Sequence, residues 1–256
     1  MLALRPLPAL EDNYIWTLAN DHGEALIVDP GDAAPVFEAI AAGLRPVAIL
    51  LTHHHPDHVA GAAALLEKFA IPCFAPHDDR ILAASHRVGE GDRVHIEALD
   101  LSFDVLAIPG HTLSHIAYHG GGLLFCGDTL FSLGCGRLFE GSPAQMLASL
   151  DRLAALPPET TVCCGHEYTE SNGRFARVVE PDNRDRDARL EEVRELRARG
   201  EPSLPSSIAS ERACNPFLRA DLAAVRASLE QHAGAMIADR LQAFTLMREW
   251  KNGFRA

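Results

Sequence analysis

The chain has 256 residues, of which 47% are hydrophobic, enough for one large domain or for a large and a smaller one. Its 23 Lys and Arg residues against 35 Asp and Glu residues give a formal net charge of -12, which argues against general binding of nucleic acid or anionic membranes. Since neither a secretory segment nor an apolar run of ~18 residues is evident, we expect a soluble cytoplasmic protein with free thiols.

The first part of the chain is predicted to contain two paired strands and then alternating helices and strands. The pairing is indicated by the turn sequence Asn20-Asp21-His22-Gly23, which suits a hairpin. Asp29 lies in an Asp-Pro-Gly sequence, and we interpret it as a turn residue rather than as a distant carboxylate that supports a site. The elements we expect are strands at 13–18 and 24–28, a helix at 34–44, a buried strand at 46–51, a helix at 59–69 and a strand at 71–75.

A β-rich segment follows, and then the character of the chain changes. Period-two patterns predict strands at 93–96, 101–106, 116–118, 123–126 and 161–164, with a helix at 146–156 capped by Ser142. Charged helical runs follow at 182–200, 220–232 and 235–250. We place a boundary near Asn172, between a β-rich domain over residues 1–172 and a small helical domain over residues 173–256.

The densest group of ligand-type side chains comes directly after the buried strand at 46–51. Imidazoles at His53, His55 and His58, with the carboxylate of Asp57, are suitable ligands for zinc, iron or manganese. A lone histidine is usually structural, but four histidines and an aspartate within six residues indicate a metal site. His54 is the expected bystander, because it breaks the H-x-H-x-D-H pattern.

Three further ligand-type residues, His111, Asp128 and His166, also follow strand-like segments. Each has a glycine directly before it, and glycine permits tight turns and close approach of the backbone to a metal. Singly, each is more often a hydrogen-bonding cap, but with the first cluster they form a specific constellation. Cys164 could be a thiol nucleophile, but we interpret it as a buried strand cysteine.

Several motifs carry a resemblance to a known family. The stretches T-H-x-H-x-D-H at 52–58, P-G-H-T at 109–112, G-D-T-L-F at 127–131 and C-G-H-E-Y at 164–168 resemble the metallo-β-lactamase superfamily. This resemblance implies an α+β fold, an αββα sandwich with metals at the sheet edge, followed here by a small C-terminal helical domain. The G-C-G-R at 134–137, the N-P-F-L-R at 215–219 and the ending at 247–251 resemble glyoxalase II, the hydroxyacylglutathione hydrolases.

The resemblance to glyoxalase II implies two divalent metal ions, expected to be zinc, with iron or manganese as alternatives. One metal would take His53, His55 and His111, the other would take Asp57, His58 and His166, and Asp128 would bridge both. Asp57 and Asp128 would then be the catalytic carboxylates around a metal-bound hydroxide, since a metal lowers the pKa of bound water to about 7.

The same resemblance implies that the glutathione part of the substrate is held by Arg137, Phe139, Tyr168, Arg248 and Lys251. Without it, the basic end of the chain would be interpreted as a solvated helix face. Arg137 stands where Lys is common and Phe139 where Tyr is common, while Pro56 replaces the more usual Trp. These departures remove no metal ligand and bear on how tightly the thiol carrier binds.

The predicted activity is hydrolysis of S-(2-hydroxyacyl)glutathione, typically S-D-lactoylglutathione, to glutathione and D-lactate, the second step of methylglyoxal detoxification. A thiol of pKa about 8.5 can leave without a strong general acid, and we find no separate acid motif. The alternatives are a persulfide dioxygenase with one iron, another hydrolase of the same fold, and a non-catalytic metal-binding or RNA-processing scaffold. We expect a monomer without nucleic-acid or membrane partners.

Overall fold

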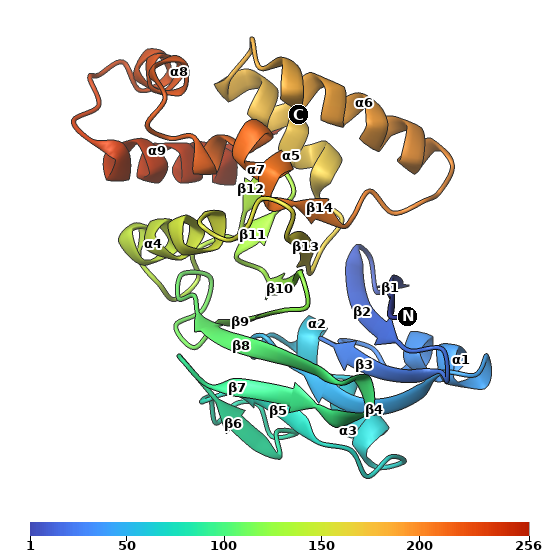
Figure 1. Cartoon of the computed structure of the whole chain (residues 1–256). Coiled ribbons are helices and arrows are strands. Elements are labelled where there is room, and N and C mark those ends of the chain that lie inside the picture. Colours follow the sequence, from blue (N-terminus) through green and yellow to red (C-terminus); the bar gives the residue numbers. More distant parts are fainter. Residues whose placement is uncertain (256) are drawn as a thin grey trace. The chain divides into compact units, whose positions relative to one another are not determined.

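The computed structural model describes residues 1–255 (Figure 1). Judged by internal contacts, these residues form two compact units, each of which is described by itself. The N-terminal unit comprises Met1–Ile108, Ser114–Gly127 and Cys163–His166. The C-terminal unit comprises Pro109–Leu113, Asp128–Val162 and the described residues from Glu167 onward.

The N-terminal unit contains a mixed six-stranded sheet in the order β1-β2-β3-β4-β5-β6. The short turn at Asn20–Gly23 makes β2 and β3 an antiparallel hairpin, whereas the longer connection through a helix makes β3 and β4 parallel. The strands are β1 (Ala3–Ala9), β2 (Asn13–Ala19), β3 (Glu24–Val28), β4 (Arg45–Leu50), β5 (Cys73–Pro76) and β6 (His86–Val88).

Three helices accompany this sheet: α1 (Ala34–Ala41), α2 (Pro56–Val59) and α3 (Ala62–Leu66). Alternate strand residues such as Ile15, Ile27 and Ile49 form one apolar cluster with Val36 of α1 and Leu65 of α3. Successive strand side chains point to opposite faces, so the intervening residues, also buried, face away from these helices.

A second sheet has the strand order β14-β13-β10-β9-β8-β7. Its members are β7 (Arg93–Ile96), β8 (Leu101–Ala107), β9 (Ile116–Gly120), β10 (Leu123–Gly127), β13 (Thr161–Cys164) and β14 (Ser206–Ser207), with a 3-10 turn, η1 (Glu97–Leu99), after β7. The buried Tyr118 of β9 donates its hydroxyl to the carbonyl oxygens of Leu51 (3.1 Å) and Phe74 (3.2 Å). Within the N-terminal unit, β9 of the second sheet therefore packs on the first sheet.

The C-terminal unit is mainly helical. Ser142 begins its first helix with a reciprocal cap, in which the Ser142 hydroxyl accepts the Gln145 N–H and the Gln145 side chain accepts the Ser142 N–H, confirming the predicted cap. The elements are β11 (Leu130–Phe131), β12 (Gly134–Cys135), α4 (Pro143–Ala154), α5 (Thr169–Val179), α6 (Arg184–Ala198), α7 (Ile208–Cys214), η2 (Pro216–Leu218), α8 (Ala223–Ala233) and α9 (Arg240–Gly253).

Most predicted elements are confirmed, and the departures have local causes. Within the helix expected at 59–69 only α3 forms, after the short α2, because the Gly61 N–H donates to the Pro30 carbonyl oxygen at 2.8 Å instead of continuing the helix from α2. The last helix begins at Arg240 rather than at 235, because Asp239 caps it by accepting the Gln242 N–H. Asp78, in the polar segment after β5, is buried and accepts hydrogen bonds from Arg80 and Ser114.

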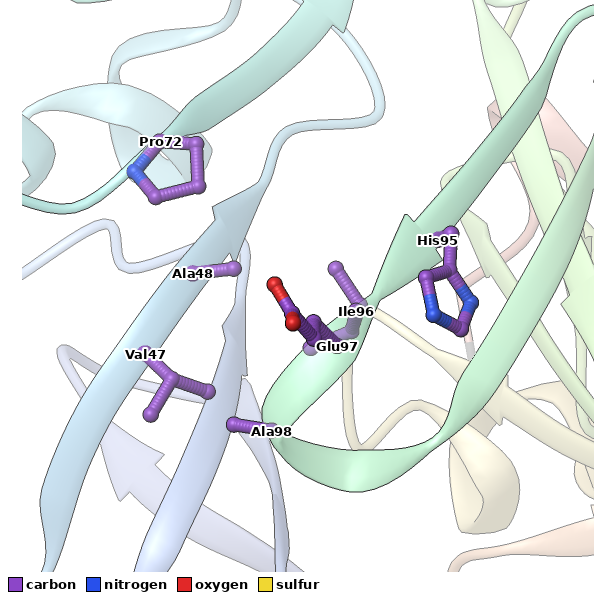
Figure 2. A pocket seen from close by; sticks show the side chains of 7 residues that line it. All are labelled: Val47, Ala48, Pro72, His95, Ile96, Glu97 and Ala98. Atoms are coloured by element: carbon purple, nitrogen blue, oxygen red, sulfur yellow. The ribbon is translucent and has the colours of Figure 1, made fainter.

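Among residues 1–255 no helix is long and apolar enough to cross a membrane. A cavity of about 430 Å³ lies in the N-terminal unit, where Val47 and Ala48 of β4 face the segment from His95 to Ala98 (Figure 2). Val47 and Ala48 lie near the start of β4, whereas the histidine-rich turn follows its end. The cavity is therefore separate from the candidate ligands.

Candidate metal centre

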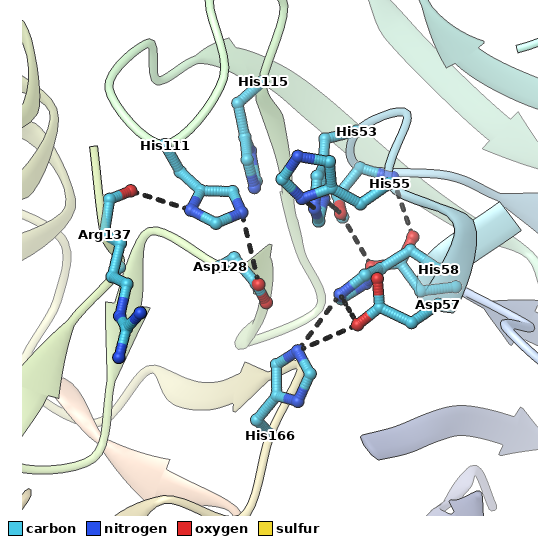
Figure 3. A network of polar contacts seen from close by, with 12 residues as sticks. His53, His55, Asp57, His58, His111, His115, Asp128, Arg137 and His166 are labelled. Atoms are coloured by element: carbon cyan, nitrogen blue, oxygen red, sulfur yellow. Dashed lines mark hydrogen bonds and ion pairs between the residues drawn. The ribbon is translucent and has the colours of Figure 1, made fainter. Parts of the chain in front are cut away.

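Five candidate ligands meet within the N-terminal unit. His53, His55, Asp57 and His58 come from the turn after β4, where Pro56 starts α2, and His166 follows the end of β13 (Figure 3). A bridge between Asn13 and His166 fixes the end of β13, together with the Tyr14 N–H, which donates to the Gly165 carbonyl oxygen at 2.8 Å. The imidazoles of His53 and His58 are buried.

Asp57, His58 and His166 place three ligand atoms at the corners of a triangle. The Nε2 atoms of His58 and His166 are 3.3 Å apart. Asp57 Oδ2 lies 3.4 Å from His166 Nε2 and 3.6 Å from His58 Nε2. Ligands of a tetrahedral zinc ion, with Zn–N bonds of about 2.0–2.1 Å, lie roughly 3.3 to 3.4 Å apart. The triangle therefore has the size that a zinc ion requires.

The Nδ1 atoms of His58 and His166, which we call the outer nitrogens, show that Nε2 is the ring atom available to bind a metal. His58 Nδ1 lies 3.0 Å from Asp29 Oδ2, and His166 Nδ1 lies 2.7 Å from Asp12 Oδ1. An ionised carboxylate only accepts hydrogen bonds, so each Nδ1 carries the hydrogen and, in a neutral ring, Nε2 presents a lone pair. Two such lone pairs and a carboxylate oxygen facing one another repel, and a shared cation relieves that repulsion.

His53 and His55 form a second pair in the same turn, with His53 Nε2 lying 3.1 Å from His55 Nδ1. The Thr52 hydroxyl donates to Asp29 Oδ2 at 2.7 Å, so its oxygen accepts from His53 Nδ1 at 3.1 Å and leaves His53 Nε2 as a lone pair. Asp29 lies in a turn, with φ of 50°, as predicted. Its carboxylate also supports the candidate ligands, which was the alternative interpretation. This carboxylate binds both His58 and Thr52.

The C-terminal unit holds the other two candidate ligands. His111 Nε2 lies 3.4 Å from Asp128 Oδ2, and His111 Nδ1 donates to the Arg137 carbonyl oxygen at 2.8 Å (Figure 3). In a neutral His111 ring, Nε2 is therefore unprotonated and its lone pair faces the Asp128 carboxylate. Gly136 is required here, because a Cβ at that position would lie 1.8 Å from the Asp128 carbonyl oxygen.

Three nearby residues were not found from the sequence. His115 is buried and stacks on His53 at 4.5 Å between ring centroids, while Asp12 and Thr52 bind outer nitrogens of candidate ligands. Asp12 and His166 are 154 positions apart, and no periodicity connects them. His54 lies 3.5 Å from Asp78, and no group of candidate ligands among the described residues includes it.

The C-terminal unit also gathers four cations, Arg137, Arg174, Arg248 and Lys251, which we call the basic cluster. Arg248 is only 4% exposed, and its Nη1 donates to the Cys135 carbonyl oxygen at 2.7 Å. Lys251 donates to the Ser171 carbonyl oxygen at 3.3 Å. Burial first, and then the charges of the three arginines, lower the pKa of Lys251 from 10.5 to about 8.

The two predicted aromatic contacts belong to the same unit. Phe139 is 63% exposed, its ring centroid lies 5.2 Å from that of His111, and its N–H donates to the His111 carbonyl oxygen. Tyr168 lies 5.2 Å from Phe131 between ring centroids. Cys164 is fully buried and directs its thiol at the His166 carbonyl oxygen, as expected of a strand cysteine.

Comparison with known proteins identifies the superfamily. The model of the metallo-β-lactamase superfamily matches residues 13–166. Among solved structures, the BLEG-1 B3 metallo-β-lactamase is 26% identical with a TM-score of 0.63, over 85% of this chain and 99% of that one. TTHA1623 in a di-iron-bound form is 27% identical with a TM-score of 0.59, over 84% of this chain and 100% of that one. The chain is a metallo-β-lactamase-fold protein, which confirms the predicted fold class.

Relatives that match over the full length identify the family within this superfamily. The model of the hydroxyacylglutathione hydrolase C-terminus matches residues 167–254. The hydroxyacylglutathione hydrolase of Xylella fastidiosa (strain M12) is 52% identical over 99% of this chain and 98% of its own length. The enzyme of that name from Nitrosomonas eutropha is 50% identical over the whole of both chains. This chain belongs to the hydroxyacylglutathione hydrolase family.

Proposed function

We propose that this chain hydrolyses S-(2-hydroxyacyl)glutathione thioesters, typically S-D-lactoylglutathione, to glutathione and D-lactate. Membership of the family supports the substrate class. The observation that carries the chemistry is the triangle of Asp57, His58 and His166, whose ligand atoms lie 3.3 to 3.6 Å apart. In the neutral rings neither Nε2 carries a hydrogen, so the two imidazoles cannot hydrogen-bond to each other. A cation bound between them suits this arrangement.

We assign the seven ligands as the family resemblance implies. His53, His55 and His111 would hold one divalent ion, Asp57, His58 and His166 the other, and Asp128 would bridge them. Zinc suits this set of five imidazoles and two carboxylates, with iron or manganese as alternatives. Such a pair supplies Lewis acidity that polarises a carbonyl and activates water near neutral pH.

The chain's own residues prepare this centre before substrate arrives. The carboxylates of Asp12 and Asp29 hold two imidazoles in the tautomer that directs Nε2 inward. Asp57 and Asp128 would reduce the repulsion between two dications, while the neutral imidazoles leave the pair net positive. A developing oxyanion is stabilised by such a positive charge.

The basic cluster is the proposed binding site for the thiol carrier. Glutathione carries two carboxylates and one ammonium, so a protein with net charge -12 needs a local concentration of cations to bind it. Arg248 and Lys251 of α9, with Arg137, supply that charge. Phe139 and Tyr168 would add aromatic contacts. We accordingly propose residues 1–172 as the hydrolase domain and 173–256 as the substrate-binding domain.

We further propose a monomer that acts in the cytoplasm. All six cysteines are free and buried, which suits a reducing compartment. The negative net charge gives no support to a nucleic-acid or membrane partner.

The test is hydrolysis of S-D-lactoylglutathione compared with its amide analogue. A thiolate leaves without a strong acid, so the thioester should turn over and the amide should react far more slowly. Equal rates would count against the proposal. Oxygen uptake with a glutathione persulfide would instead favour the dioxygenase alternative.

A further inference from the structure

The outer nitrogens of the candidate ligands have two kinds of partner. His58 and His166 donate Nδ1–H to carboxylates, those of Asp29 and Asp12. His53 and His111 donate Nδ1–H to neutral oxygens, the Thr52 hydroxyl and the Arg137 carbonyl. A carboxylate raises the basicity of the imidazole it accepts from more than a neutral oxygen does. The candidate ligands are therefore not equivalent.

We propose that Asp12 and Asp29 are positioning residues that make Asp57, His58 and His166 the tighter of the two metal sites, so that the first equivalent of metal binds there. Neither residue belongs to the seven ligands of the proposed metal centre. The inference rests on the proposed metal centre and is independent of which thioester is cleaved.

The first residue of β2 and the residue before it orient two of the three ligands of this site. Asp12 Oδ1 lies 2.7 Å from His166 Nδ1, and the next residue, Asn13, donates Nδ2–H to Asp57 Oδ2 at 3.0 Å. The bridge between Asn13 and His166 keeps this segment in register with the end of β13. The ligand atoms of Asp57 and His166 are thus held in place by side chains that do not bind the metal.

Asp29 orients the third ligand from a buried position. Its carboxylate is 5% exposed and accepts three hydrogen bonds, from the Thr52 N–H (2.8 Å), the Thr52 hydroxyl (2.7 Å) and His58 Nδ1 (3.0 Å). Because the carboxylate is fixed by Thr52, the His58 ring cannot turn without losing its partner. Its charge also acts in a region that water does not screen.

The test is a titration of metal-free protein with Co²⁺ in competition with a chromophoric chelator. The wild type should bind in two steps of unequal affinity. Asp12→Asn keeps the shape and removes the charge, so it should weaken the first step about tenfold and leave the second unchanged. Loss of such outer partners typically costs 10–100-fold in affinity, and the 34% exposure of Asp12 places it at the lower end.

Asp32→Asn is the matched control, because this carboxylate accepts the Ala34 N–H at the start of α1. It should leave both steps unchanged. A crystal grown with one equivalent of Co²⁺ should show anomalous density among Asp57, His58 and His166. Density elsewhere, two equal steps in the wild type, or an unchanged first step in Asp12→Asn would overturn the inference. Failure to bind Co²⁺ at all would instead reject the proposed metal centre itself.

Discussion

The turn after β4 and the basic cluster both bring like groups together, but they do so by different means. The turn supplies His53, His55, Asp57 and His58 from one short segment fixed by a strand, a proline and a helix. The basic cluster draws on residues from Arg137 to Lys251, which meet only through the packing of the C-terminal unit. The candidate ligands of the turn are therefore visible as a motif, whereas the basic cluster is not.

The turn and the basic cluster also differ in their electrostatics. Where Asp57 and His58 of the turn meet His166, lone pairs and a carboxylate face one another at 3.3 to 3.6 Å, which suits a cation. In the basic cluster, neighbouring positive charges help to lower the pKa of Lys251, which suits an anion. Each region is thus prepared for a ligand of the opposite charge, and the following variants test the two separately.

The largest effect should come from removing a ligand of the turn. His58→Ala should reduce turnover of S-D-lactoylglutathione by at least ~10³, because the cation it helps to hold supplies several kcal/mol of stabilisation. Bound metal, measured by elemental analysis, should fall below two per chain. His54→Ala, in the same turn, is the control and should retain both metal and activity. Equal losses in the two variants would contradict the assignment.

The basic cluster should affect binding more than chemistry. Lys251→Ala should raise KM for the glutathione thioester about tenfold with little change in kcat, because a hydrogen bond to a charged group contributes about 1.5–3 kcal/mol and Lys251 is partly exposed. Lys68→Ala removes the other lysine of the chain and should leave KM unchanged. A fall in kcat with constant KM would show that Lys251 does not bind the carrier.

A smaller effect is expected from pH. The pKa of Lys251 is lowered to about 8, so the ammonium is lost as pH rises through 8, and KM should rise several-fold between pH 7 and 9. Between pH 8 and 10.5 the unfolded chain binds more protons at this lysine than the folded chain, so the free energy of unfolding should increase with pH. Lys251→Arg keeps its charge and should flatten the KM profile. A rise in KM that persists in this variant would assign it to another group.

The smallest effect should come from Phe139, which is exposed beside His111. Phe139→Tyr adds a hydroxyl donor, and a neutral hydrogen bond of about 0.5–1.5 kcal/mol should lower KM roughly two- to tenfold. Steady-state kinetics with unchanged kcat would support a role in carrier binding. An unchanged KM would show that the hydroxyl finds no acceptor on the substrate.

The sequence predicted those parts of the molecule that depend on local patterns. The strands around the turn, the Ser142 cap and the candidate ligands all follow from periodicity, capping residues and spacing. Asp12 could not be recognised, and the supporting role of Asp29 was only an alternative, because their partners His166 and His58 lie far along the chain and only folding brings them together. The burial of Arg248 likewise depends on the carbonyl oxygen of Cys135, which no helical pattern reveals.

The central claim is that metal ions held by these imidazoles and carboxylates carry the reaction. It is tested most directly by measuring S-D-lactoylglutathione hydrolysis and metal content together, during removal of metal with a chelator and its stepwise return. The account predicts that activity disappears with the metal and is fully restored when two divalent ions are bound per chain. Undiminished hydrolysis by the metal-free protein would contradict it.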